Sequence, residues 1–195
     1  MKQYIKNQIK LSFETKQAIY KNEALLDRIV DVATKCIEIY KDSKKIILAG
    51  NGGSAADAQH IAAEMVGRYG FDRPSLPALA LTTDTSALTA IGNDYGYDMV
   101  FSRQLEGMGQ DGDLFIGIST SGNSQNLINA FKIAKNKNIT TVALVGKDGG
   151  GMAKIADIAL VVPSDSTPRI QESHILIGHI ICDIIEKEIF ANGVV

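Results

Sequence analysis

Cysteine is scarce in this sequence, with only Cys36 and Cys182 among 195 residues. The two lie far apart, and each falls within an apolar pattern of helical spacing. A disulfide framework or a cysteine-rich metal cluster needs more thiols at shorter spacings. We therefore expect two reduced cysteines that serve only as core residues.

The chain also lacks an excess of basic charge and a long hydrophobic run. Its 20 Lys and Arg against 22 Asp and Glu give a formal net charge of -2, so neither nucleic acid nor an anionic membrane is expected as a primary partner. No segment approaches the ~18–20 consecutive apolar residues of a membrane span, and the N-terminus MKQYIKNQIKLSFETKQ lacks the apolar core of a signal peptide. We expect a cytoplasmic protein that binds small molecules or proteins.

What is present matches an ordinary globular domain. Apolar residues make up 45% of the chain and charged residues 22%, and 195 residues suit one core. Linkers, internal repeats and low-complexity tracts are not apparent. Residues 1–195 are therefore predicted to form a single domain.

Apolar spacing predicts the order of the elements. Residues 1–42 show the three-and-four spacing of two amphipathic helices, from about Tyr4 to Tyr40. Five short apolar runs then follow, which are IILAG, ALALT, DLFIGIS, TTVALVG and IALVVP. Helical patterns separate them at 55–69, 86–91 with 98–106, 126–136 and 149–156. This alternation predicts an α/β fold in which helices cover both faces of a parallel sheet.

The last helical segment, residues 168–190, is unusually apolar. Isoleucines occupy almost every side of its middle. A helix that is apolar nearly all round is buried on more than one side. We expect it to build a subunit interface together with residues 1–42.

Two turns at strand ends carry unusual chemistry. GNGGS (Gly50–Ser54) has glycines that allow close backbone approach and a serine able to cap the next helix; it fits either a ligand loop or a tight structural turn. STSGNS (Ser119–Ser124) places four hydroxyls before a helix start, where anions bind favourably. A phosphate site is the favoured interpretation of this second turn, and a helix cap is the alternative.

His60 and Glu64 are four residues apart, so on a helix they share a face. Alone, this spacing often marks a surface pair. The flanking residues are apolar or small, which favours a partly desolvated carboxylate able to act as a general base.

The final helix carries Gln171, His174 and His179. Gln171 and His179 lie two turns apart, a rise of about 12 Å. One metal accepts both only if the side chains lean together or come from different subunits, and the sequence leaves both arrangements open. His174 has no evident companion, so we expect it to be structural, bonded to a neighbouring carbonyl.

The motifs GNGGSAADAQHIAAE, RPSLPALAL, IGNDYG, ISTSGNS, VALVGKDGG and RIQESHILIGHIICDIIE, taken in this order, resemble the phosphoheptose isomerase (sedoheptulose 7-phosphate isomerase) family of sugar-isomerase (SIS) domain proteins. The resemblance covers about residues 25–189. It implies a flavodoxin-like three-layer sandwich with a five-stranded parallel sheet. It also implies a homotetramer with active sites at subunit interfaces.

The resemblance assigns roles residue by residue. Glu64 is implied as the catalytic base and His179 as the partner acid. Implied substrate contacts are Asn51, Gly52, Gly53, Arg68, Asn93, Asp94, Ser119, Thr120, Ser121, Ser124 and Gln171. Zinc-binding members imply a metal site at His60, Glu64, Gln171 and His179. Pro168 departs from the acidic residue that some members carry there.

The implied reaction converts sedoheptulose 7-phosphate into D-glycero-D-manno-heptose 7-phosphate through an enediolate, the first step towards an activated heptose for lipopolysaccharide or capsule. Two alternatives remain. RPSLPALAL and TTDTSALTAI also resemble the DnaA initiator-associating protein, a tetrameric SIS-domain regulator of replication initiation; the resemblance implies serine and asparagine there in place of Glu64 and His179. An isomerase of another phosphosugar is the second alternative.

Overall fold

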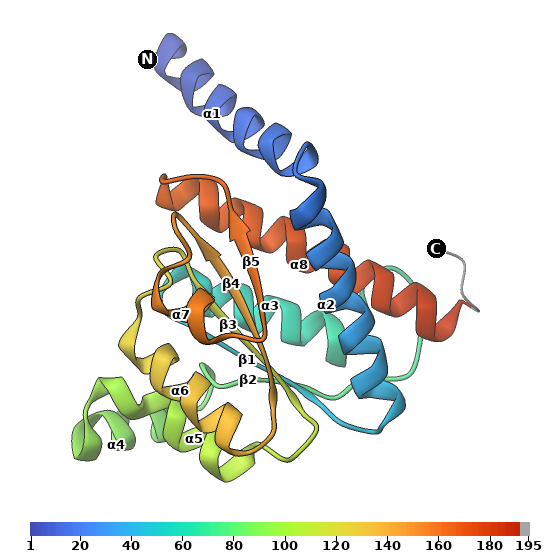
Figure 1. The fold of residues 1–195 in the computed structure, drawn as a ribbon, viewed down its shortest axis with the longest axis vertical. Coiled ribbons are helices and arrows are strands. Elements are labelled where there is room, and N and C mark those ends of the chain that lie inside the picture. The colour runs from blue at the N-terminus through green and yellow to red at the C-terminus, as the bar shows by residue number, and fades with distance from the viewer. Residues whose placement is uncertain (192–195) are drawn as a thin grey trace.

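The computed structural model describes residues 1–191 as a parallel sheet between layers of helices (Figure 1). The strands are β1 (Ile46–Gly50), β2 (Ala78–Ala80), β3 (Leu114–Ser119), β4 (Thr140–Gly146) and β5 (Ile158–Val162). The helices are α1 (Lys2–Tyr20), α2 (Glu23–Lys41), α3 (Gly53–Val66), α4 (Thr85–Tyr95), the 3-10 helix η1 (Tyr97–Met99), α5 (Val100–Met108), α6 (Gln125–Asn136), α7 (Gly150–Ile155) and α8 (Thr167–Phe190).

The sheet has the predicted parallel topology. Its five strands run in the order β2-β1-β3-β4-β5, and every neighbouring pair is parallel. This is the flavodoxin-like order, in which the chain leaves β1 towards one edge and returns to build the other from β3. Ligands in such sheets bind beyond the carboxyl ends at this switch point. GNGGS follows β1 and STSGNS begins at the end of β3, so both turns lie there.

The strand side chains divide the core into two layers. Ile46 and Leu48 pack with residues of α2, α3 and α8, whereas Ile47 and Ala49 pack with residues of α5 and α6. Successive strand residues point to opposite faces, and helices cover both faces here. This explains why the strands read as continuous apolar runs, and it confirms the three-layer sandwich.

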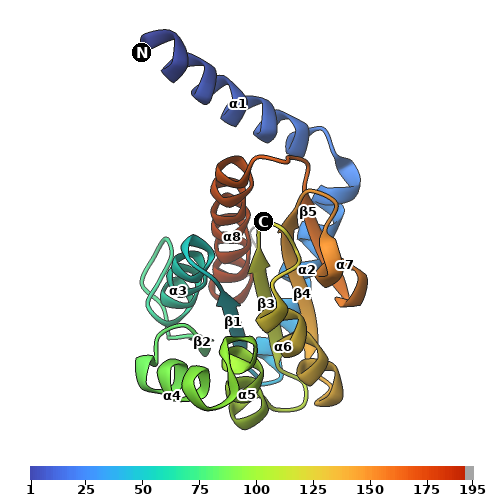
Figure 2. The same ribbon diagram turned by 90° about the vertical axis from the view of Figure 1, so that its left-hand side faces the viewer.

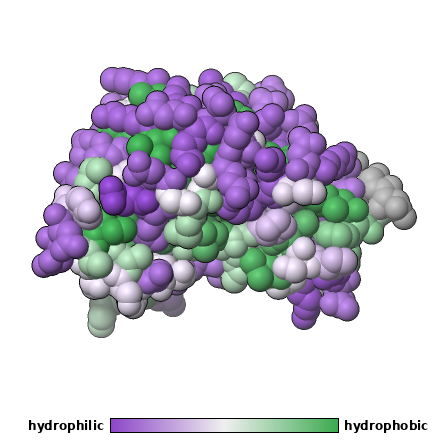
Figure 3. Space-filling model, turned by 90° about the horizontal axis from the view of Figure 1, so that it is seen from below, coloured by the Kyte–Doolittle hydropathy of each residue, from purple (hydrophilic) through white to green (hydrophobic). Residues whose placement is uncertain are grey.

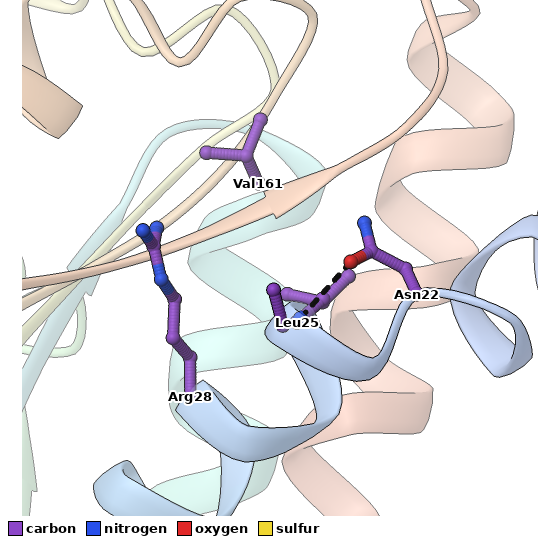
Figure 4. A pocket seen from close by; sticks show the side chains of 5 residues that line it. Asn22, Leu25, Arg28 and Val161 are labelled. Carbon is purple, nitrogen blue, oxygen red and sulfur yellow. Dashed lines mark hydrogen bonds between the residues drawn. The ribbon is translucent and has the colours of Figure 1, made fainter.

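The start of α2 is fixed against the edge strand β5. The Asn22 side chain accepts a hydrogen bond from the Leu25 backbone N–H at 3.1 Å and caps the helix (Figure 4). Arg28 Nη1 donates to the carbonyl of Ala159, 3.0 Å away. Asn22, Leu25 and Arg28 line a surface pocket together with Ala24 and Val161. The cap fixes the start of α2, and the arginine bond ties this helix to the edge strand.

Helix α1 extends away from the rest of the molecule (Figures 1 and 2). Only Thr15 and Ile19 of this helix are buried. It exposes several large apolar side chains, namely Tyr4, Ile5, Ile9, Phe13 and Tyr20. The opposite end of the molecule instead shows separate hydrophobic patches among hydrophilic residues (Figure 3).

The apolar character of α8 is explained largely by the chain's own core. The helix packs on α2 and α3 and buries Ile170, Ile177, Ile181 and Ile185. Leu176 and Ile180 are the large apolar residues of α8 that stay exposed. Across residues 1–191, the structure has no helix that is both long and apolar enough to cross a membrane.

Both cysteines are buried and free, as predicted. Burial raises the pKa of the Cys36 thiol to about 12. The thiolate form is therefore strongly disfavoured.

The predicted end of the helix over 55–69 was wrong. Helix α3 ends at Val66, with Gly67 as its non-helical C-cap, and a carboxylate from α8 binds backbone N–H groups of the segment that follows. Glu186 accepts from Tyr69 at 2.8 Å and from Phe71 at 3.1 Å. Such contacts join segments far apart in the chain, so no local spacing of residues predicts them.

Candidate active site

The two turns at the switch point contact each other directly. The amides of Asn51 and Asn126 exchange two hydrogen bonds, each 3.0 Å long, across 75 residues of sequence. The hydroxyl of Tyr97 donates to Asn51 Oδ1 at 3.1 Å. Gly52 has a φ of 56°, which glycine adopts without strain. The first turn is therefore fixed to the start of α6 and leaves Gly52 and Gly53 exposed.

The hydroxyls of the second turn face one another. Ser119 Oγ lies 3.0 Å from Ser124 Oγ and 3.5 Å from Ser121 Oγ, and it accepts from the Gly122 N–H at 3.2 Å. Thr120 is half-buried in the same turn. Ser124 occupies the N-cap position of α6, yet its side chain makes no capping bond. This geometry favours the phosphate interpretation over the helix cap.

Helix α3 carries the predicted His–Glu pair. His60 Nε2 lies 3.0 Å from Glu64 Oε1, as expected for residues one turn apart. The side chain of Glu64 is only 17% exposed, and its Oε2 is buried with no hydrogen-bond partner among the described residues. An unpartnered buried oxygen is costly in a purely structural side chain.

Helix α8 brings His179 to the same place. Its Nε2 lies 3.1 Å from His60 Nε2 and 3.4 Å from Glu64 Oε1. The approach depends on Gly178, since a Cβ there would stand 2.6 Å from the side chain of Ile61. Helix packing within one chain therefore joins the His60–Glu64 pair to an imidazole that is 119 residues from His60 in the sequence.

These three side chains have the spacing of a metal site. The ligand atoms of His60, Glu64 and His179 all lie within 4.8 Å of one another. Tetrahedral zinc with bonds of ~2.0–2.1 Å separates its ligand atoms by roughly 3.3 Å, close to the distances here. The two ring nitrogens face each other, so either one donates a proton to the other or both direct lone pairs at a cation. The donor set therefore fits zinc.

Gln171 lies elsewhere within the chain. Its amide packs on the start of α3, so closely that a Cβ on Gly53 would overlap it. Gly53 and His60 are seven residues apart on α3, about 10 Å along the axis. The structure thus groups Gln171 with the glycine turn, and its role as a fourth ligand stays a prediction.

Three predicted substrate contacts lie outside these two groups. Asn93 Nδ2 donates to Asp94 Oδ1 at 2.8 Å, and both residues are exposed in the last turn of α4. Arg68 is exposed beyond the end of α3. Hydrogen bonds from these residues to the remaining site residues are absent in the part of the chain that the structure describes. Their roles stay predictions.

Several further residues lie at the site that the sequence motifs did not indicate. Asp57 lies one turn before His60 on α3, with Oδ2 buried and unpartnered among residues 1–191. Burial raises its pKa to about 6, although His60 and His179 act in the opposite direction. Asp57 and His60 are three residues apart on α3 and so share a helix face, which could have indicated Asp57 from the sequence. Asn126 and Tyr97 contact Asn51 across long sequence separations, which give no such signal.

His174 bonds to a neighbouring carbonyl, as predicted. It is fully buried, and its Nε2 lies 3.1 Å from the carbonyl oxygen of Val145. The carbonyl belongs to β4 of the same chain rather than to a subunit interface.

Comparison with known proteins settles the family. The SIS domain family model matches residues 13–146. The chain is 79% identical over 194 residues to the phosphoheptose isomerase of Sulfurimonas denitrificans, with 100% of both chains covered. It belongs to the phosphoheptose isomerase family.

Other family members agree across the whole chain. The phosphoheptose isomerase of Aneurinibacillus thermoaerophilus is 62% identical, with 98% of this chain and 97% of that protein covered. The solved structure of the phosphoheptose isomerase from Neisseria gonorrhoeae has 46% identity and a TM-score of 0.90, with 95% of this chain and 98% of that chain covered. The family and its fold, predicted from the motifs, are confirmed.

Proposed function

We propose that the protein isomerises sedoheptulose 7-phosphate to D-glycero-D-manno-heptose 7-phosphate. The observation that carries this proposal is the 3.4 Å separation of Glu64 Oε1 and His179 Nε2, which come from α3 and α8. Aldose–ketose isomerisation moves a proton between two adjacent carbons and needs a base on one and an acid at the neighbouring oxygen. The family membership of the chain agrees with this reaction.

Glu64 is the proposed base and His179 the proposed acid. The Glu64 side chain is 17% exposed while its Oε2 is buried, so Oε1, beside both imidazoles, is the oxygen proposed to take the proton from the substrate carbon. His179 donates a proton to the adjacent oxygen as the enediolate forms. The side chain of His179 is 35% exposed, so a substrate can reach it.

The proposed phosphate site is the hydroxyl turn Ser119–Ser124. Its serines and the start of α6 supply hydrogen-bond donors without a permanent positive charge. Binding the phosphate here fixes the remote end of the sugar, so the reacting carbons are held against Glu64. The Asn51–Asn126 amide pair keeps this turn in register with α3.

Zinc is the proposed metal, held by His60, Glu64 and His179 with Gln171 as the proposed fourth ligand. When bound, it would polarise the substrate oxygens and stabilise negative charge on them, and Glu64 and His179 would have to leave the metal in order to exchange protons with the substrate. Metal analysis after prolonged chelation tests this proposal. We expect zinc in the purified protein and loss of activity on its removal, and full activity of verified metal-free protein would contradict it.

We further propose a homotetramer with active sites at subunit interfaces. The support is α1, whose apolar side chains lack cover from the described chain. His60, Glu64 and His179 come from one chain, so neighbouring subunits would complete the surrounding walls of the site. The exposed Arg68, Asn93 and Asp94 are the residues available for that role.

An isomerisation assay across five-, six- and seven-carbon ketose phosphates, followed by NMR, tests the function. We expect efficient turnover of the seven-carbon substrate. Preference for a shorter substrate would indicate another phosphosugar isomerase. No turnover of any of them would favour the replication-regulator alternative and contradict the proposal.

A further inference from the structure

A buried ion pair lies immediately beyond the end of α3. Arg73 Nε lies 2.9 Å from Glu186 Oε2, and the two side chains keep only 2% and 1% of their exposure. Burying two charges is costly unless both are also well hydrogen-bonded. The remaining hydrogen bonds of Arg73 and Glu186 therefore identify the segments that this pair connects.

Arg73 binds the backbone of the proposed base. Its Nη2 donates to the carbonyl of Glu64 at 2.7 Å, and its Nη1 donates to the carbonyl of Met65 at 2.7 Å. Carbonyls in the last turn of a helix lack intrahelical partners. The guanidinium thus caps α3 at the residue that carries the proposed chemistry.

Glu186 binds the segment that follows α3. Its two oxygens accept from the backbone N–H groups of Tyr69, Gly70 and Phe71 at 2.8, 2.5 and 3.1 Å. Although burial alone would raise the pKa of Glu186, these donors and Arg73 hold it below its usual value. Glu186 therefore stays ionised, and all of its acceptor capacity faces this segment and Arg73.

Glu186 and His179 lie on the same helix. They are seven residues apart on α8, which is about two turns, so they share a face. A direct chain of contacts consequently runs from the Glu64 carbonyl through Arg73 and Glu186 to the helix that holds His179. Arg73 also lies over the ring of Phe190, 5.6 Å from its centroid, near the end of α8.

We propose that Arg73 and Glu186 are positioning residues that set the spacing of Glu64 and His179. This inference rests on the proposed function. The pair contacts neither side chain of the site, so it acts through the helix backbones. Catalytic side chains must be held within ~0.5 Å of their productive positions, so a fixed end of α3 would help to keep Glu64 in place.

The test uses Arg73→Lys. Lysine keeps a positive charge opposite Glu186, but it lacks the planar fork that reaches both carbonyls. We expect kcat to fall about 10- to 100-fold with KM within about 2-fold, and the zinc dissociation constant of the metal-stripped protein to rise about 10-fold. Both are measured at a temperature where circular dichroism shows complete folding.

Lys45→Met is the matched control. It breaks another ion pair with a buried carboxylate, Lys45 Nζ to Asp113 Oδ2 at 2.6 Å, at the amino ends of β1 and β3. We expect lower stability with unchanged kcat and zinc affinity. If Arg73→Lys does not fold, the double variant Arg73→Gln/Glu186→Gln replaces it, because it removes both charges but keeps a donor for the α3 carbonyls and an acceptor for the backbone N–H groups. The same losses are expected in that variant.

The outcomes separate this inference from the proposed function. A wild-type protein inactive on sedoheptulose 7-phosphate would overturn the function, and zinc affinity would then decide the positioning role. An active wild type together with a folded Arg73 variant of normal kcat and zinc affinity would overturn the inference. A change confined to KM would also overturn it.

Discussion

At the scale of single residues, His174 shows how burial alone fixes a protonation state. Burial lowers its pKa to about 4, although the bond to the Val145 carbonyl favours the charged form. The unfolded chain takes up a proton near the ordinary value of about 6.5, while the folded chain does not. Folding stability is therefore fully present above about pH 6.5 and falls as the pH drops towards 4.

We predict that His174→Gln flattens this pH dependence. The glutamine amide can keep a hydrogen bond to the Val145 carbonyl but does not titrate. Wild-type protein should lose stability between pH 6.5 and 4 by up to about 1.4 kcal/mol per pH unit more than the variant. Urea unfolding at several pH values measures the difference. Parallel curves for the two proteins would show that His174 does not cause the loss.

At the scale of elements, Ser124 distinguishes the two interpretations of the hydroxyl turn. Because its side chain does not cap α6, Ser124→Ala should leave the unfolding free energy nearly unchanged. A lost hydrogen bond to a charged phosphate costs ~1.5–3 kcal/mol, so kcat/KM should fall at least about 10-fold, mainly through KM. Steady-state kinetics and urea unfolding check both parts.

Asn22→Ala is the control, since Asn22 does cap a helix. Its loss should cost about 1 kcal/mol of stability with little kinetic effect. Ser124→Ala behaving in the same way would support the cap interpretation instead.

Elements formed by local patterns were predictable, and those set by distant contacts were not. The strands followed from short apolar runs, and the two ligand turns followed from glycine and serine placed after β1 and β3. Gly67 at the C-cap of α3 was a usable local signal for the helix end, whereas the backbone contacts of the following segment were not predictable, because Glu186 makes them from more than 110 residues away. The meeting of His179 with Glu64 depends on the close packing of Gly178 on Ile61, which no spacing encodes.

At the scale of the whole molecule, α1 leaves apolar surface that the described chain does not cover. Phe13 is 63% exposed on this helix. We predict that Phe13→Glu preserves the fold but dissociates the proposed tetramer, because a buried charge at an interface is costly. Light scattering coupled to size-exclusion chromatography measures the mass.

Asn7→Glu, at an exposed position about 120° round the same helix from Phe13, should leave the assembly unchanged. A Phe13→Glu variant with the mass of the wild-type tetramer would rule out this face as the interface. A monomeric wild type would contradict the proposed assembly itself.

The central claim is that Glu64 and His179 act together on the same two substrate carbons. The most direct test measures kcat for sedoheptulose 7-phosphate with Glu64→Gln, His179→Gln and the double variant. Residues that act as a unit have strongly non-additive effects, so each single change should cost at least ~10²-fold and the double variant should be little worse than the poorer single one. Normal turnover in either single variant, or losses that simply multiply, would contradict the account.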